Sequence, residues 1–201
     1  MIDSTATWSE FLDAVAARAP TPGGGAVAAA AGALAAAMGE MVLNYSLGKK
    51  DLATHAATFE DALAQLHRAR QLLLRLVVED QAAYEALTAA RKQGDATARD
   101  AALLTAIRVP QSIAATAAAV LEQAERVAPV ANRWLLSDLA VCAELAMATI
   151  RCAGYNVRVN LADVSEAAEG ERFSRWCDDL TRRSVATLCR TLAQVWKRIE
   201  A

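Results

Sequence analysis

Apolar residues recur every three or four positions along most of the chain, the spacing that places them on one face of an α-helix. This spacing predicts helices over about 7–18, 24–46, 52–92, 96–127, 130–153 and 171–199. Thr7 can cap the first helix, because Glu10 stands three residues later and completes a capping-box pattern. Pro110 is expected to kink the fourth helix, and Gly154 is expected to end the fifth.

The composition points to the same fold class. Alanine, the best helix former, accounts for 49 of the 201 residues, whereas glycine (9) and proline (4) are scarce. We therefore predict an all-α protein: a single domain over 1–201, built as one bundle of about six helices with long central helices. Between Leu135 and Ile150 the fifth helix carries only two charges, Asp138 and Glu144, so the bundle is expected to form a homodimer through its apolar surface.

Charge and cysteine spacing argue against several classes of protein. A net charge of −2 and a pI near 5.7 lack the basic excess that nucleic-acid binding requires. The four cysteines form no C-x-x-C pair, so no metal site is expected, and the thiols are predicted to be buried and reduced in a cytoplasmic protein. The first ten residues lack the basic segment of a signal peptide.

One uncharged stretch, residues 19–39, is long enough to cross a membrane. It opens with prolines and glycines and is then mostly alanine, which gains little from lipid. We expect it to form a central helix of the bundle and expect no membrane partner.

A glycine string provides the first candidate for chemistry. Gly23, Gly24 and Gly25 stand at the start of a predicted helix, where backbone N–H groups are free and the helix dipole is positive. Without side chains there, a ligand can approach the backbone closely. The string matches neither the P-loop nor the dinucleotide fingerprint. A flexible turn that permits tight packing is the alternative.

Two carboxylates stand among apolar residues. Asp138 lies inside an apolar run, and Asp80 follows such a run one turn before Tyr84. A carboxylate in these surroundings can have a perturbed pKa, which suits a general base or a group that stabilises a cation. The alternatives are an ion pair with an arginine for Asp138 and a solvated helix edge for Asp80.

Two pairs of polar residues complete the candidate set. Asn156 and Asn160 are four residues apart, which puts both amides on one side of the chain, where they can read the donors and acceptors of a ligand. Capping and turn formation after Gly154 is the alternative. Lys49 and Lys50 can hold an anionic ligand tail or form a solvated charge run.

These pieces occur in an order that resembles a known family. They are the Pro-Thr-Pro-Gly-Gly-Gly-Ala-Val-Ala-Ala string from Pro20, Gly48-Lys49-Lys50, Asp80 with Ala83-Tyr84, Ser137-Asp138-Leu139, and Asn156-Val157-x-x-Asn160-Leu161. Their order resembles the cyclodeaminase/cyclohydrolase family, which comprises the C-terminal half of formiminotransferase-cyclodeaminase and free-standing bacterial relatives. The resemblance covers nearly the whole chain, and its most specific parts are the glycine string and the Asn-Val-x-x-Asn-Leu string.

The resemblance implies an all-α dimer that acts on a tetrahydrofolate, with no metal and no cofactor other than that substrate. Free-standing members resemble methenyltetrahydrofolate cyclohydrolase, which opens 5,10-methenyltetrahydrofolate to 10-formyltetrahydrofolate with water. Fused members expel ammonia from 5-formiminotetrahydrofolate. Since the 201 residues contain no formiminotransferase half, we expect the cyclohydrolase. The alternatives are the cyclodeaminase and a non-catalytic helical dimer that has lost folate chemistry.

The resemblance also implies roles for the residues of this chain that stand at the family's motif positions. The resemblance implies acid/base and cation-stabilising roles for Asp138 and Asp80, which an active enzyme is expected to use in a polar pocket that holds Asp138 and Asn156 together. Substrate binding is expected from Gly23, Gly24, Gly25, Ser137, Asn156 and Asn160, with Lys49 and Lys50 at the glutamate tail. Three positions depart from the family pattern: Ala26 replaces a common serine, Trp134 an asparagine and Ala140 a glycine. A changed or lost activity is therefore a further alternative.

Overall fold

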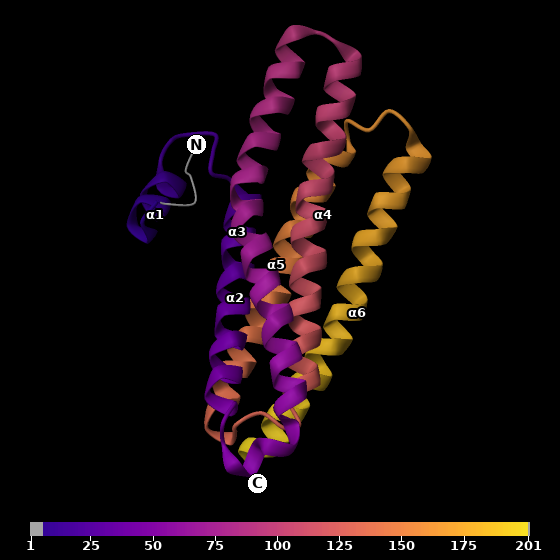
Figure 1. Cartoon of the computed structure of the whole chain (residues 1–201). Coiled ribbons are helices and arrows are strands. Elements are labelled where there is room, and N and C mark those ends of the chain that lie inside the picture. Colours follow the sequence, from indigo (N-terminus) through magenta and orange to yellow (C-terminus); the bar gives the residue numbers. More distant parts are fainter. Residues whose placement is uncertain (1–5, 201) are drawn as a thin grey trace.

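The computed structural model of the chain describes residues 6–200, in which every regular element is a helix. Two short 3-10 helices, η1 (Lys50–His55) and η2 (Arg133–Leu135), join α2 to α3 and α4 to α5. The six α-helices are α1 (Trp8–Ala16), α2 (Gly24–Ser46), α3 (Ala56–Gln93), α4 (Ala96–Val127), α5 (Leu136–Leu161) and α6 (Ala167–Ile199). The prediction of an all-α fold is confirmed (Figure 1).

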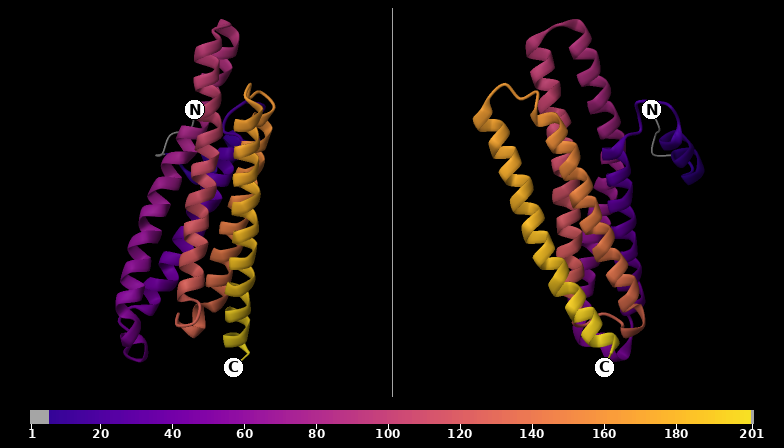
Figure 2. Two further views of the ribbon diagram at one scale, coloured as in Figure 1. Left: turned by 90° about the vertical axis from the view of Figure 1, so that its right-hand side faces the viewer. Right: turned by 180° about the vertical axis from the view of Figure 1, so that it is seen from behind.

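Helices α2 to α5 form a four-helix bundle. Helix α2 packs on α3 and α5, α4 packs on the same two helices, and α6 covers α5 and α4 (Figure 2). The α3–α4 connection at Gly94 projects beyond the other helices, and we call this the hairpin end of the bundle. The α1–α2 loop and the last turns of α5 lie toward the hairpin end, whereas η1, η2 and the first turn of α5 lie at the opposite end.

Small residues explain how closely α2 packs against its neighbours in the bundle. A Cβ atom at Gly32 would lie 3.0 Å from Thr149 of α5 and 3.1 Å from Leu73 of α3, and one at Gly39 would lie 2.9 Å from Leu66. The backbone of α2 therefore approaches both neighbours more closely than a larger residue would allow. The stretch therefore forms a helix of the bundle, as expected, although the face that carries Val27 and Leu34 is exposed.

Two helices, α2 and α4, are long and apolar enough to cross a membrane by length and composition alone. In each, 56% of the apolar window is buried inside the bundle. A core helix of a bundle passes the same test, so these features are weak evidence for membrane insertion.

The helix ends agree with the predictions at the start of the chain and differ near the end. The capping box is confirmed, because Glu10 N–H donates to Thr7 Oγ1 at 3.3 Å and Thr7 N–H donates to Glu10 Oε2 at 2.7 Å. The prediction that Gly154 ends a helix is wrong: α5 runs on to Leu161. Gly154 is buried in the helix packing, which overrides its weak helix propensity. Residues 155–161, which the prediction left outside any helix, therefore form the last turns of α5.

The cysteines also depart in part from expectation. All four are free thiols, but only Cys142 and Cys177 are buried, whereas Cys152 and Cys189 are exposed. The prediction of four buried thiols is thus wrong for the two that lie on outward faces of α5 and α6. Burial raises the pKa of Cys142 to about 12.

Candidate functional site

A cavity of about 350 Å³ lies at the hairpin end, where the α1–α2 loop meets α3, α4 and the last turns of α5. It brings together the glycine string, the Asp80 region and both candidate asparagines, which are far apart in the sequence. The cavity is lined by Pro20, Thr21, Gly23, Gly24, Gly25, Asp80, Ala83, Tyr84, Leu87, Arg91, Ala106, Asn156, Val159 and Asn160. We call it the Asp80 pocket.

The carboxylate of Asp80 lies directly against the first turn of α2. A Cβ atom at Gly25 would stand 2.0 Å from Asp80 Oδ1, so only glycine fits beneath the carboxylate. The backbone N–H of Ala26 donates a hydrogen bond to Asp80. Because Gly23 offers no side-chain cap, Asp80 supplies the negative charge that a helix N-terminus favours.

Burial determines the ionisation of Asp80. Desolvation raises the pKa of its carboxyl above the ordinary value, and the hydrogen bond from Ala26 opposes part of that shift. The alternative of a solvated helix edge is wrong for Asp80, although the neighbouring Glu79 is exposed. A carboxylate with a raised pKa accepts protons more readily than an exposed one, as a general base must.

The two asparagines line the same pocket with their amide groups fixed by the backbone. Asn156 Nδ2 donates to the Cys152 carbonyl at 2.9 Å. Asn160 Nδ2 donates to the carbonyls of Ala106, at 3.2 Å, and Asn156, at 3.1 Å. Since only the NH2 group can donate to a carbonyl, each amide oxygen is identified and can accept from a ligand N–H. Both residues thus belong to helix α5 rather than to a turn.

One wall of the pocket is formed by a face of α3, and sequence reasoning missed most of it. Tyr84, Leu87 and Arg91 follow Asp80 at intervals of four, seven and eleven residues, so all four share one face of α3. Val159 of α5 also lines the pocket and is exposed. The helical spacing from Asp80 was the signal that could have identified Leu87 and Arg91.

The remaining candidates do not reach this pocket within one chain. Lys49 and Lys50 lie where α2 joins η1, and Ser137 and Asp138 lie in the first turn of α5, at the opposite end. Asp138 precedes Asn156 by 18 residues of one continuous helix, or about 27 Å. The expectation that Asp138 and Asn156 share a pocket is therefore wrong for a single chain.

The opposite end has its own polar features. Asn132 N–H donates to Ser46 Oγ at 3.1 Å, and Trp134 is exposed beside Arg133, whose guanidinium lies 4.5 Å from the ring centre. Among residues 6–200, Asp138 forms no ion pair with an arginine, contrary to the structural alternative considered for it.

No group of three or more His, Cys, Asp or Glu side chains in the described part of the chain could hold a metal ion. The absence of a metal or cofactor and the cytoplasmic location stay predictions.

Comparison with known proteins gives consistent matches. The formiminotransferase-cyclodeaminase family model matches residues 7–178. A methenyltetrahydrofolate cyclohydrolase from Methylorubrum extorquens is 34% identical over 174 residues, which cover 82% of this chain and 84% of that protein. The formimidoyltransferase-cyclodeaminase of Gallus gallus is 32% identical over 165 residues, 78% of this chain but 30% of that longer protein.

A solved structure agrees with the fold. The crystal structure of a formiminotetrahydrofolate cyclodeaminase from Thermotoga maritima superposes with a TM-score of 0.86 at 30% sequence identity. The match covers 98% of this chain and 96% of the other.

Proposed function

The chain belongs to the formiminotransferase-cyclodeaminase family, and we propose that it is an enzyme that hydrolyses 5,10-methenyltetrahydrofolate to 10-formyltetrahydrofolate. The observation that carries this proposal is the half-buried Asp80 carboxylate, held at the N-terminus of α2 in a pocket with two oriented amides. The cyclohydrolase relative supports the choice, because it matches over most of both chains.

The chemistry needs a base beside a cationic carbon. The methenyl bridge is an amidinium carbon, to which water adds while a carboxylate accepts the proton and stabilises the positive charge. Asp80 takes this role, since its raised pKa strengthens it as a base. The protonated Asp80 then delivers the proton to N5 as the C–N5 bond breaks. The hydroxyl proton is released as the carbinol carbon becomes the formyl group on N10.

The other pocket residues bind and orient the substrate. The amide oxygens of Asn156 and Asn160 accept from N–H groups of the reduced pterin. The backbone at Gly23 and Gly24 is open to close approach, and a Cβ at Gly24 would stand 3.3 Å from Asn156 Oδ1. These roles follow from placement in the pocket and from the chemical type of each group.

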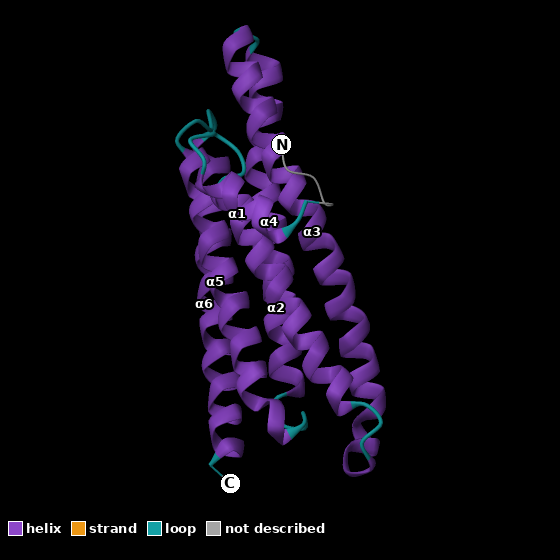
Figure 3. Ribbon diagram, turned by 90° about the vertical axis from the view of Figure 1, so that its left-hand side faces the viewer, coloured by secondary structure: helices purple, strands orange, loops and turns teal. Residues whose placement is uncertain are grey.

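We infer further that the protein is a homodimer. Exposed apolar side chains lie along α2 and α5, which are neighbouring antiparallel helices (Figure 3): Val27, Leu34, Val141 and Tyr155. A two-fold axis across this face would place the opposite end of one copy beside the hairpin end of the other. Lys49, Lys50, Ser137 and Asp138 of the second copy would then complete the Asp80 pocket.

The primary test follows the near-ultraviolet absorbance of 5,10-methenyltetrahydrofolate in a buffer in which spontaneous hydrolysis is slow. We expect the protein to accelerate loss of the methenyl band and Asp80→Asn to abolish the acceleration. Glu79→Gln is the matched control, because it removes a neighbouring but exposed carboxylate. Full turnover by Asp80→Asn would remove the proposed base.

The alternative activity is the cyclodeaminase, favoured by the similarity to the Thermotoga maritima protein over almost its full length. It predicts ammonia release from 5-formiminotetrahydrofolate, and this assay distinguishes the two reactions. A protein that binds no folate in either assay would instead be a helical dimer without this chemistry, and the substitutions at Ala26, Trp134 and Ala140 would then mark lost catalysis.

A further inference from the structure

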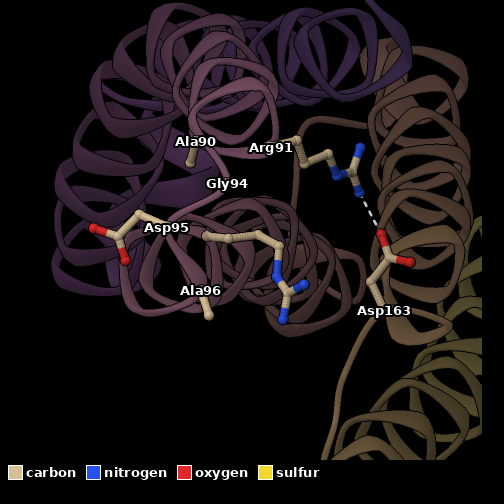
Figure 4. Close-up of a pocket in the computed structure, with 7 residues that line it drawn as sticks. Ala90, Arg91, Gly94, Asp95, Ala96 and Asp163 are labelled. Atoms are coloured by element: carbon tan, nitrogen blue, oxygen red, sulfur yellow. Dashed lines mark hydrogen bonds and ion pairs between the residues drawn. The ribbon is translucent and has the colours of Figure 1, made fainter.

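A second cavity, of about 340 Å³, adjoins the Asp80 pocket and shares Arg91 with it. It is lined by Ala90, Arg91, Gly94, Asp95, Ala96, Arg99 and Asp163. The side chain of Arg91 points from α3 across to Asp163, which follows the end of α5 (Figure 4). None of the roles assigned so far uses this cavity, although Arg91 lines both it and the reaction site.

The α3 residues that line the two cavities follow one another along the helix from Asp80 to Arg91, and we call this row of residues the path. From Asp80 to Arg91 the helix rises about 16 Å. The face between them presents a carboxylate, then the ring of Tyr84, then the aliphatic Leu87 and finally a guanidinium. A ligand with a cationic head, a flat aromatic middle and an anionic tail matches this order, and the path is comparable in length to an extended aminobenzoylglutamate arm.

The guanidinium of Arg91 can exchange its present partner for a ligand carboxylate. Arg91 pairs with Asp163, and both side chains are about half exposed, so the pair is solvated and weakly held. The other carboxylate of the cavity, Asp95, is occupied at the N-terminus of α4, where it accepts from the N–H groups of Thr97 and Ala98. Asp163 is thus the anion that a substrate tail would replace.

We propose that Arg91 binds the glutamate carboxylate of the folate substrate, at the end of a path that begins at Asp80. This inference rests on the proposed function and specifies how the substrate lies. The aminobenzoyl ring packs on Tyr84 and Leu87, and the planar guanidinium receives a carboxylate through two parallel N–H donors. Within one chain it replaces Lys49 and Lys50 in that role, because both lie at the opposite end of the bundle.

The test compares 5,10-methenyltetrahydrofolate with 5,10-methenyltetrahydropteroate, which lacks the glutamate and ends instead in the shorter benzoate carboxylate. The intact enzyme is expected to prefer the folate by about tenfold in kcat/KM, through KM, as for a partly solvated bidentate ion pair. Arg91→Ala should lower kcat/KM for the folate by the same factor and leave the pteroate within about twofold. Arg91→Lys should restore part of the preference, and added salt should weaken it.

A matched variant separates binding from a structural role. Asp163→Asn breaks the same ion pair from its other side and frees Arg91, so KM for the folate should fall or stay unchanged. If Asp163→Asn and Arg91→Ala instead raise KM for both substrates alike, the pair is structural and the proposal is overturned. Loss of the folate preference in a Lys49→Ala/Lys50→Ala variant, together with its retention in Arg91→Ala, would overturn it as well.

The inference and the proposed function can fail separately. Turnover of both compounds with equal kcat/KM would keep the cyclohydrolase and refute the tail site. Calorimetric binding of tetrahydrofolate and tetrahydropteroate needs no turnover, so a preference for the former that Arg91→Ala removes would support the tail site in an inactive protein. If neither compound binds, both proposals are wrong.

Discussion

The contact between Gly25 and Asp80 makes a sharp prediction for Gly25→Ala. The added Cβ would stand 2.0 Å from Asp80 Oδ1, 2.4 Å from Cγ and 2.7 Å from Oδ2, so the carboxylate must move. Any movement that clears the methyl group also disturbs the hydrogen bond from Ala26. The substitution therefore displaces the proposed base without changing its chemical type.

The magnitude follows from the same contact. Overpacking costs about 1–3 kcal/mol, and the higher helix propensity of alanine offsets up to ~1 kcal/mol of it. The net loss of about 1–2 kcal/mol corresponds to a fall in Tm of roughly 5 °C for a domain of this size. Displacement of a general base should lower kcat by about 100-fold or more, far beyond what the stability loss explains.

The assays are thermal denaturation and decay of the methenyl absorbance, with two control variants. Gly170→Ala adds the same methyl group to α6, where it meets no atom within 4 Å, so it should leave kcat unchanged and raise Tm slightly through the higher helix propensity of alanine. Gly32→Ala is crowded by Thr149 and Leu73 but lies away from Asp80. It should lower Tm while retaining kcat at temperatures where the protein is folded.

A double-mutant cycle provides the result that would refute this reasoning. Asp80→Ala removes the three atoms that the new Cβ meets, so Gly25→Ala should cost no stability in that background. An equal fall in Tm in both backgrounds would show that the clash is not with Asp80. Normal kcat in Gly25→Ala would show that the position of the carboxylate does not matter for turnover.

Further predictions concern pH, assembly and thiol chemistry. Because burial raises the pKa of Asp80, kcat/KM should fall as the pH drops through a value above 3.8. Protonation of this carboxyl favours folding, so its contribution to stability is present below pH 3.8 and is lost as the pH rises through the raised pKa. Profiles of activity and Tm against pH, measured for the protein and for Asp80→Asn, test both signs. Mixing inactive Asp80→Asn and Asp138→Asn chains under conditions of subunit exchange should restore about one quarter of the activity if each site takes one residue from each copy of a two-fold dimer, and no restoration would exclude the shared site. Leu34→Glu, on the exposed apolar face of α2, should convert dimers to monomers in light scattering. Alkylation of the native protein followed by mass spectrometry should label the exposed Cys189 and spare the buried Cys142, whose pKa lies near 12.

Helix propensity and hydrophobic spacing predicted the elements where local forces decide the structure. The α1 capping box, the bounds of α2 and the bounds of α4 all follow from short-range patterns that the structure repeats. The prediction failed at Gly154, because a glycine that looks like a helix end is held inside α5 by packing with its neighbours. Propensity is worth at most about 1 kcal/mol at one residue, and burial of a helix face exceeds that.

For the candidate site, too, the sequence predicted one part correctly and could not predict another. The residue types and their order along the chain were sufficient to identify Asp80, the glycine string and the two asparagines, which the structure brings into one pocket. Sequence order could not show that Asp138 lies about 27 Å from Asn156, since that depends on whether α5 is continuous. Nor could it show that Arg91 lines two cavities.

By itself the sequence determined the helical class, most helix bounds and the chemical groups available for a reaction, because these depend on local propensity and composition. Only the tertiary structure decided which of those groups meet. The carboxylate of Asp80 acquires its raised pKa and its place beside Gly25 when α3 packs on α2, and neither property exists in either helix alone. Burial and close contact arise from packing between distant segments, which is why the site could be predicted in its parts and not in its arrangement.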